Sequence, residues 1–309
     1  MGSYFIIKKV ILIIFVKVFF WKFIEILNFN LYYKIFILNE KRKLKQSFNR
    51  DNKIASLKNI EDFNAKKYKT SDTLFVLGSG ASINSLKEEH WQEIRNSDSI
   101  GFNFWPLHDF VPTYYVFEVP FTHKRRELLI EILNSKSKDY SNTPIIKKTS
   151  NVTIDLNRFN PVIIDNLYLS NDIELPGMLK FSDVLDRISC DGKLDELSYL
   201  LRKRASLSYM IFFAIRCGYK KIVLCGVDLN NTNYFYDNID YSDKFSFSKM
   251  TSEQSGNLHK TMNSNSSNLT IDKVILEINQ KILKKHNIYL YIGSKSSILY
   301  PKLKYFFTD

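Results

Sequence analysis

Cysteine is scarce in this chain of 309 residues: there are three, and no two have the C-x-x-C spacing of a zinc or redox site. The sequence therefore predicts neither a disulfide-stapled scaffold nor a cysteine-based zinc site. Cys217 and Cys225 flank a predicted buried strand, and we expect small core residues in a reduced compartment. A D-x-D pair placed to hold a divalent ion over a diphosphate is also absent, so we predict no metal cofactor.

The N-terminal region has no uncharged apolar run that could span a bilayer. Val10–Val16 is wholly apolar but falls short of the about 20 residues that a spanning helix needs, and no signal-peptide cleavage site follows it. Tyr4–Leu38 is nevertheless mostly apolar, and Asn39–Lys53 is dense in Lys and Arg. This pairing predicts a peripheral anchor on the cytoplasmic face of the inner membrane. The alternative is a helical hairpin packed on the domain with a solvated basic face.

Acidic residues are outnumbered, with 32 Asp and Glu against 44 Lys and Arg, which gives a net charge of +12. Such an excess indicates an anionic partner: a lipid surface, a nucleic acid or a phosphorylated substrate. Because the basic residues concentrate beside the apolar N-terminal segment, we favour an anionic membrane and predict no nucleic-acid partner. The sequence leaves the oligomeric state open.

The first strong strand and the turn after it organise the rest of the chain. Thr73–Leu77 has no polar alternation, as expected of a strand buried on both faces, and Gly78-Ser79-Gly80 follows it. Glycine lets the backbone approach a ligand closely, and the start of the next helix offers N–H groups to an anion. The three-glycine dinucleotide fingerprint is incomplete, since Ile83 stands in the third position. An ordinary strand-to-helix turn is the alternative.

Strand and helix patterns alternate along the chain, which predicts an α/β domain with a mostly parallel sheet. The expected strands are Thr73–Leu77, Ser99–Asn103, Thr113–Val119, Pro144–Lys148, Pro161–Asp165, Lys221–Cys225 and Ile288–Ile292. The expected helices are Ser85–Arg95, His123–Asn134, Leu194–Cys217 with a possible break near Arg204, and Ile271–His286. We assign residues 1–55 to the membrane segment, 56–72 to a linker and 73–309 to the domain, with an aperiodic lid over residues 229–268.

Polar side chains gather where the predicted strands end, and ligands of open parallel sheets bind beyond these ends. The set contains hydroxyls, amides, two carboxylates, an arginine, tyrosines and one lid histidine: Ser79, Ser82, Asn103, Glu118, Arg204, Ser206, Ser208, Asp228, Asn230, Tyr234, Tyr236 and His259. Such a set can bind a sugar, a base and a phosphate without a metal. Tyrosine hydroxyls can donate to a leaving phosphate, and histidine is the best-placed general base near neutral pH.

Several motifs in this order resemble the bacterial sialyltransferases of glycosyltransferase family 42 and their relatives. That family opens with a strand and G-N-G-P-S, where this chain has Gly78–Ser82, and its second strand ends in an asparagine, here Asn103. Its R-x-T-S-G motif corresponds to Arg204–Ser208, and the run A-x-x-x-G-Y-K-x-I-x-L-x-G-I-D to Ala214–Asp228. A lid with tyrosines and a histidine follows. The resemblance covers about residues 73–297 and leaves the N-terminal segment unmatched.

The resemblance implies a single Rossmann-like domain, a GT-A-like variant, and an inverting transfer from a donor activated with cytidine monophosphate (CMP). By position, His259 is the base, and Tyr234 donates to the phosphate. The family's second tyrosine has no clear match, and Tyr236 and Tyr241 are the alternatives for it. Arg204 joins this catalytic group. The resemblance implies that Ser79, Ser82 and Asn103 touch the nucleotide and that Ser206 and Ser208 meet the donor's carboxylate. From the glycine turn and the strand ends, the expected donor-binding residues also include Gly78, Gly80, Glu118, Asp228 and Asn230.

Two departures from the family pattern leave the donor open. Ser208 replaces the glycine of T-S-G, and Glu118 stands where an asparagine is expected. Sialic acid, another nonulosonic acid and Kdo all remain candidates, and the glycan acceptor would belong to lipopolysaccharide or capsule synthesis. The rival functions are a non-catalytic membrane-bound scaffold of a glycan assembly complex and a G-x-G methyltransferase. The second rival would want an acidic residue where Asn103 ends the second strand.

Overall fold

The computed structural model describes residues 29–51, 57–148, 152–170, 172–175, 180–190, 200–237, 239–246, 258–263 and 269–308. The chain divides into two units, residues 1–49 and 50–309. What is described of the first is helix α2 (Phe29–Asp51), which contains most of the predicted basic run. Of the helices in the described ranges, none is both long and apolar enough to cross a membrane. The apolar segment before α2 lies outside the described residues, so its predicted role stays a prediction.

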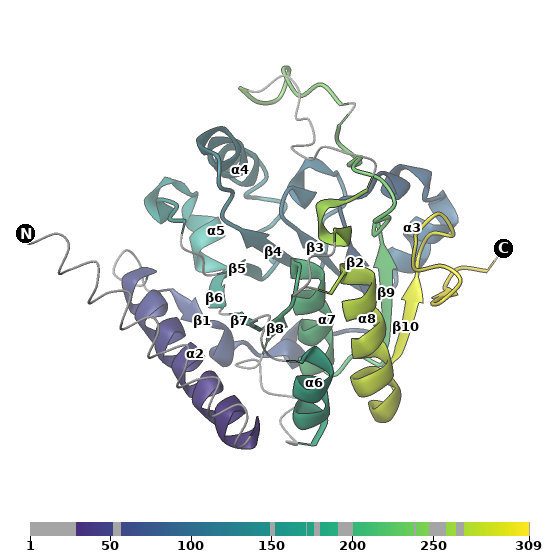
Figure 1. The fold of residues 1–309 in the computed structure, drawn as a ribbon. Helices are drawn as coiled ribbons and strands as arrows, with labels where there is room; N and C mark the ends of the chain where they lie inside the picture. Colours follow the sequence, from purple (N-terminus) through teal and green to yellow (C-terminus); the bar gives the residue numbers. More distant parts are fainter. Residues whose placement is uncertain are drawn as a thin grey trace, which may run out of the picture. The chain divides into compact units, whose positions relative to one another are not determined.

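The second unit is built on a nine-stranded sheet whose pairings are all parallel across the strands described (Figure 1). The spatial order is β1-β6-β5-β4-β3-β2-β9-β10-β11. Its strands are β1 (Lys58–Asn59), β2 (Thr73–Leu77), β3 (Asp98–Phe102), β4 (Tyr114–Glu118), β5 (Ile145–Lys148), β6 (Leu167–Ser170), β9 (Lys221–Cys225), β10 (Tyr289–Ile292) and β11 (Lys304–Tyr305). The predicted α/β fold with a parallel sheet is therefore confirmed.

Strand order reverses between β2 and β9. From β2 the chain proceeds outward through β3, β4, β5 and β6, and it later returns to add β9 on the other side of β2. All five residues of β2 are buried, and Leu74 lies opposite Ile222 in the register with β9. Such a reversal opens a crevice at the carboxyl ends of the two strands, where ligands of open α/β sheets bind.

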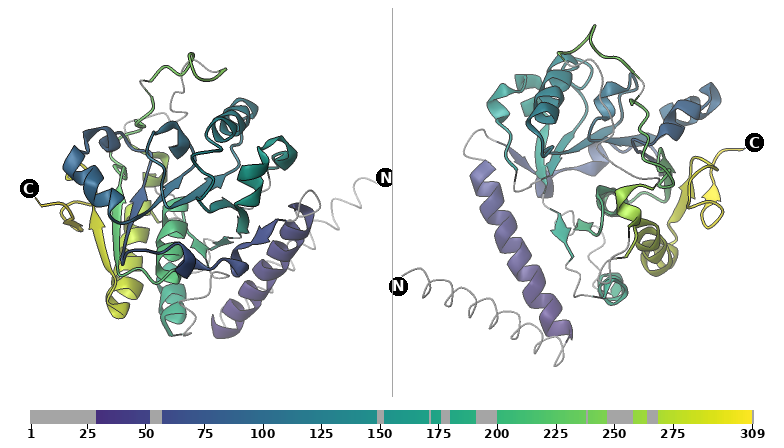
Figure 2. Two further views of the ribbon diagram at one scale, coloured as in Figure 1. Left: turned by 180° about the vertical axis from the view of Figure 1, so that it is seen from behind. Right: turned by 45° about the horizontal axis from the view of Figure 1, so that its top comes forward.

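The described helices of this unit connect and cover the strands (Figure 2). They are α3 (Glu88–Arg95), α4 (His123–Ser135), α5 (Pro161–Asp165), α6 (Phe181–Cys190), α7 (Ser206–Arg216) and α8 (Ile271–Ile278). Helix α7 is buried from Leu207 to its end, and its Phe213 packs edge-on against Tyr114 of β4. The backbone after α7 turns at Gly218, whose φ of +75° fits the predicted helix-ending glycine.

Two predicted elements differ in the structure. Pro161–Asp165, expected as a strand, is helix α5, because Asn160 caps it by accepting a hydrogen bond from the Val162 N–H, and proline suits the first helical position. The long helix expected over residues 194–217 begins at Ser206, since Arg204 has a φ of +70° that no right-handed helix contains. Strand β8 (Leu201–Arg202) precedes it and pairs with β7 (Ile173–Glu174).

The predicted linker, residues 56–72, belongs largely to the second unit. Lys58–Asn59 forms β1 and pairs with β6 at the edge of the sheet. Phe63 is buried, and Thr70 donates from both its N–H and its hydroxyl to the Asp98 carboxylate of β3. The domain therefore begins earlier than Thr73, where the sequence pattern first became strong.

Candidate active site

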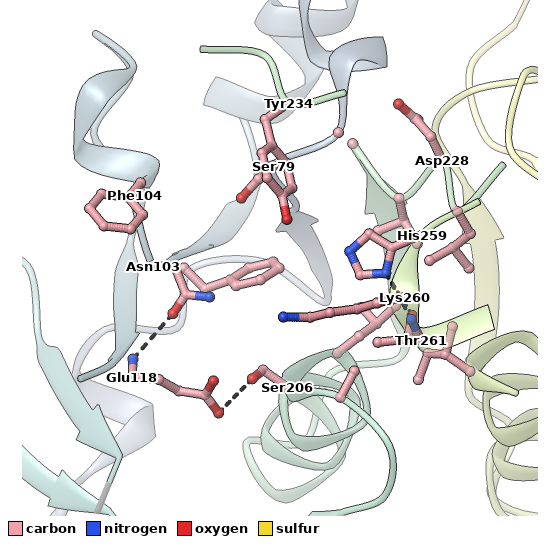
Figure 3. Close-up of a pocket in the computed structure, with 18 of the residues that line it drawn as sticks. Ser79, Asn103, Phe104, Glu118, Ser206, Asp228, Tyr234, His259, Lys260 and Thr261 are labelled. Carbon is pink, nitrogen blue, oxygen red and sulfur yellow. Dashed lines mark hydrogen bonds between the residues drawn. The ribbon is translucent and has the colours of Figure 1, made fainter. Parts of the chain in front are cut away.

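A pocket of about 350 Å³ lies beyond the carboxyl ends of β2, β3, β4 and β9 (Figure 3). It is lined by many of the residues predicted from strand ends and lid: Ser79, Gly80, Asn103, Glu118, Arg204, Ser206, Asp228, Tyr234, Tyr236 and His259. The predicted residues that do not line it are Gly78, Ser82, Ser208 and Asn230. The structure thus brings together side chains from segments far apart in the sequence.

The glycine turn serves packing between β2 and β9. The N–H groups of Gly78 and Gly80 donate to the carbonyls of Cys225 and Gly226, at 2.7 and 2.8 Å. A Cβ on Gly80 would lie 2.6 Å from the Asp228 carboxylate. Glycine is required here because two backbones approach each other, rather than because a ligand approaches one of them.

The N–H groups after this turn are also occupied. The Asp228 carboxylate accepts from the Ser82 N–H at 3.0 Å and from the Ser82 hydroxyl. This buried pair ties the β2 turn to the β9 turn, so the expected anion site at that helix start is filled by a side chain. Ser82 is therefore better explained as a structural partner of Asp228 than as a nucleotide contact.

Asn103 is held by the backbone around it so that its amide group faces the pocket. Its φ of +55° is one that asparagine tolerates better than most residues, and the Tyr115 hydroxyl donates to its carbonyl. The side-chain oxygen accepts from the Glu118 N–H at 3.2 Å. The amide NH₂ group is thereby the part of Asn103 that a ligand can meet, as a donor (Figure 3).

Arg204 is directed at the lid backbone. Its guanidinium donates to the carbonyl oxygens of Lys260 and Thr261, both at 3.1 Å, and to that of Asn263. A left-handed backbone at Arg204 aims the side chain this way. These contacts, made through Nε and Nη2, make Arg204 a residue that fastens the segment carrying His259.

His259 lies on the pocket wall at the start of the short helical turn Lys260–Met262, which it caps. Its Nδ1 lies 2.8 Å from the Thr261 hydroxyl oxygen. As the cap, Nδ1 accepts from the Thr261 N–H at 3.4 Å, which is the tautomer with the proton on Nε2. In the other tautomer Nδ1 carries the proton and donates to the Thr261 hydroxyl oxygen, and Nε2 then keeps a lone pair that can accept a proton. Burial, followed by the charge of Lys260, lowers the pKa of His259 to about 4, so the imidazole is neutral at pH 7.

The two lid tyrosines lie beside the β2 turn. Tyr234 pairs with Gly80 in an isolated antiparallel β-bridge, and the Phe235 N–H donates to the Ser79 carbonyl at 2.9 Å. The rings of Tyr234 and Tyr236 are 5.1 Å apart. Tyr236 is only 2% exposed and burial raises its pKa, while Figure 3 shows the Tyr234 hydroxyl projecting into the pocket. Tyr234 is therefore the better placed hydroxyl donor.

The remaining predicted residues outside the pocket have other partners. The Ser208 hydroxyl donates to backbone carbonyls and accepts from the Lys203 N–H at 2.9 Å. The Asn230 amide donates to the Ser296 carbonyl at 2.8 Å, and its neighbours Asn231 and Asn233 line the pocket instead. Which side chains of an irregular loop face a pocket cannot be predicted from the sequence, so the lining asparagines lie one and three residues after the predicted one.

Several further lining residues, which carry a charge, a ring or a hydroxyl group, were not predicted from the sequence. They are Phe104, Arg125, Lys260 and Thr261, and the Arg125 guanidinium lies over the Phe104 ring. Lys260 and Thr261 adjoin His259 in the sequence, which was the available signal. Nothing in the pattern of α4 distinguished Arg125 from its basic neighbours. Within the described part of the chain, no group of three or more His, Cys, Asp or Glu side chains could hold a metal ion.

We compared the chain with known proteins and solved structures. No protein-family model matches the chain, and no curated protein matches it. Among solved structures, it is similar to the monofunctional alpha-2,3-sialyltransferase Cst-I from Campylobacter jejuni, with a TM-score of 0.43 and 19% identity over 77% of this chain and 81% of that chain. A similarity of this size assigns no activity to this chain.

Proposed function

We propose that this protein is a sialyltransferase-like, inverting glycosyltransferase that moves a keto-sugar acid from its CMP donor to a sugar hydroxyl. The observation that carries the proposal is the meeting of His259, Tyr234 and Asn103 around one pocket at the strand-order reversal. They supply a neutral proton acceptor, a phenolic donor and an amide donor. In an inverting transfer without a metal, the first can take the acceptor's proton and the other two can donate to the donor substrate.

The proposed reaction is a single displacement. The acceptor hydroxyl oxygen forms a bond to the anomeric carbon while its proton passes to Nε2 of His259. The bond from that carbon to the phosphate oxygen breaks, and its electron pair leaves with CMP. Tyr234 donates a hydrogen bond to the phosphate as negative charge develops there. This step requires the tautomer in which Nδ1, 2.8 Å from the Thr261 hydroxyl oxygen, carries the proton and Nε2 keeps its lone pair.

The leaving group is a phosphate monoester that hydroxyl and cationic side chains can serve, so we expect turnover without a metal. Purified protein should release CMP from at least one CMP-activated keto-sugar acid, at an unchanged rate in excess chelator. A screen of CMP-sialic acid and CMP-Kdo, with and without glycan acceptors, tests this. Loss of activity in chelator with rescue by magnesium or manganese would contradict it, and absence of CMP binding would favour the scaffold alternative.

The proposed cellular site is the cytoplasmic face of the inner membrane, where surface glycans such as lipopolysaccharide or capsule are assembled. Deleting residues 1–49 should release the protein from anionic vesicles, because this removes the apolar segment and most of the basic run. The division of the chain at this point predicts that residues 50–309 still fold. Vesicle sedimentation checks the first expectation and circular dichroism the second; a truncated protein that still sediments would remove the anchor.

A further inference from the structure

The side chains on one wall of the pocket offer a ligand hydrogen-bond acceptors and no hydroxyl donor. The wall is formed by Glu118 at the end of β4 and Ser206 at the start of α7. The Ser206 hydroxyl donates to Oε1 of Glu118 at 2.7 Å, so its proton is turned away from a ligand. Since the Ser208 proton is also used by backbone carbonyls, neither serine offers the O–H donor that a sugar carboxylate would require.

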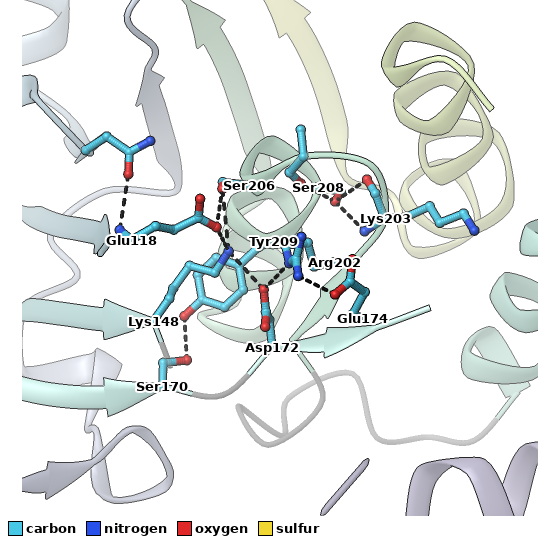
Figure 4. A network of polar contacts seen from close by, with 12 residues as sticks. Glu118, Lys148, Ser170, Asp172, Glu174, Arg202, Lys203, Ser206, Ser208 and Tyr209 are labelled. Carbon is cyan, nitrogen blue, oxygen red and sulfur yellow. Dashed lines mark hydrogen bonds and ion pairs between the residues drawn. The ribbon is translucent and has the colours of Figure 1, made fainter. Parts of the chain in front are cut away.

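A charge network extends from this wall into the protein, and one member, Arg202, also lines the pocket (Figure 4). Lys148, whose side chain is 1% exposed, pairs with both Glu118 and Asp172, the latter at 2.9 Å. Arg202 pairs in turn with Asp172 and, at 2.6 Å, with Glu174. Burial raises the pKa of Glu118, but Lys148 and the Ser206 hydrogen bond outweigh it and lower the pKa overall. The carboxylate is therefore ionised at neutral pH.

The two oxygens of Glu118 have different surroundings. Oε1 takes the contacts from Lys148 and Ser206, whereas no residue within the described ranges donates a hydrogen bond to Oε2. The side chain keeps 38% of its surface exposed, and Figure 3 shows its second oxygen directed into the pocket. An ionised oxygen in this position accepts from a ligand O–H or N–H group and repels a ligand carboxylate.

Positive charge enters the same space from the other wall. Lys260 lines the pocket next to His259, and Figure 3 shows its amino group directed toward the region in front of Glu118. A donor sugar that carries a carboxylate and several hydroxyl groups thus meets a negatively charged wall at Glu118 and a positively charged wall at Lys260. Its orientation is fixed if the carboxylate faces the lysine and a hydrogen-bond donor faces the glutamate.

We propose that Glu118 is a specificity-determining residue that accepts a hydrogen bond from a hydroxyl or amide N–H group of the transferred sugar, with the sugar carboxylate held on the Lys260 side. This inference rests on the proposed function and refines it. It replaces the expectation that Ser206 and Ser208 bind the carboxylate. It also gives a physical role to a glutamate that departs from the family pattern.

The test compares wild type with Glu118→Gln, which keeps one acceptor oxygen, adds an NH₂ donor and removes the charge. Lys148 keeps its pairing with Asp172 in this variant. Calorimetry would measure the affinities for CMP and for an inert 3-fluoro analogue of CMP-N-acetylneuraminic acid. We expect unchanged CMP affinity and a loss for the analogue of roughly tenfold or more, the effect of a hydrogen bond to a charged group. Lys260→Gln should also weaken the analogue more than CMP.

The outcomes separate this inference from the proposed function. If the wild type binds no CMP, the proposed function and the inference fall together. If the wild type binds CMP and the analogue, and Glu118→Gln binds each of them with the wild-type affinity, only the inference is overturned. Tighter binding of the analogue by Glu118→Gln would overturn it as well, because it would place the carboxylate at this wall. Retained CMP affinity shows that the variant is folded.

Discussion

Replacement of His259 by alanine should lower glycosyl transfer by at least about 10²-fold while leaving CMP affinity nearly unchanged. A sugar hydroxyl is a poor nucleophile and must lose its proton as the new bond forms. His259 supplies an acceptor on the pocket wall, and its contact with Thr261 directs Nε2 toward the ligand space. Initial rates of transfer and calorimetry with CMP measure the two quantities separately.

The matched control is His123→Ala, which removes a histidine whose side chain is 78% exposed and which does not line the pocket. It should transfer at the wild-type rate. A His259→Ala variant within a few-fold of wild type would exclude this residue as the base. A large loss of CMP affinity in that variant would instead indicate that His259 holds the lid closed.

The same histidine sets the expected pH dependence. Its proton-accepting form is neutral, and the lowered pKa of about 4 means that this form predominates above about pH 4. Activity should therefore be flat through pH 6.5, the ordinary value for histidine, and should fall as the pH drops toward 4. The sequence alone suggested an unperturbed histidine, because burial and the influence of Lys260 become visible only when the lid is placed against the pocket.

The parts of the fold that could be predicted are those with strong local patterns. The buried strands at Thr73–Leu77 and Lys221–Cys225 and the glycine after α7 carry apolar runs or backbone requirements that need no partner to be recognised. The edge strand β1 and helix α5 are short, and their identity depends on a neighbouring strand and on one capping side chain. Such tertiary and capping effects override local propensity.

The same division applies to the site. Strand ends predicted Asn103 and Glu118, because their position follows from the sheet alone. The direction of a side chain could not be predicted: Arg204 lines the pocket as expected, but its Nε and Nη2 donate to lid carbonyls. Ser208 was matched by motif position, but its hydroxyl donates to the Ala205 carbonyl at the start of its own helix. Position along a motif fixes which residues are near a site, whereas hydrogen-bond competition decides which remain available to a ligand.

The turn after β9 should be the place where a single methyl group does most damage to the fold. Gly226 has a φ of +63°, and a Cβ there would lie 2.5 Å from the Gly78 carbonyl oxygen and 2.6 Å from the Ile83 side chain. Gly226→Ala therefore combines a left-handed backbone, at about 1–2 kcal/mol, with overpacking between two strand ends, at about 1–3 kcal/mol. We expect the free energy of unfolding to fall by about 2–5 kcal/mol.

Gly218→Ala is the matched control for this prediction. Gly218 has a similar φ of +75°, but a Cβ there would meet nothing within 4 Å. Only the backbone term applies, so the loss should be about 1–2 kcal/mol. Urea denaturation of the two variants under identical conditions isolates the packing of the β2 turn against the β9 turn. Equal losses would show that the two turns move apart to accommodate the added methyl group at little cost in free energy. The close approach of Gly78 and Gly226 would then not contribute to stability.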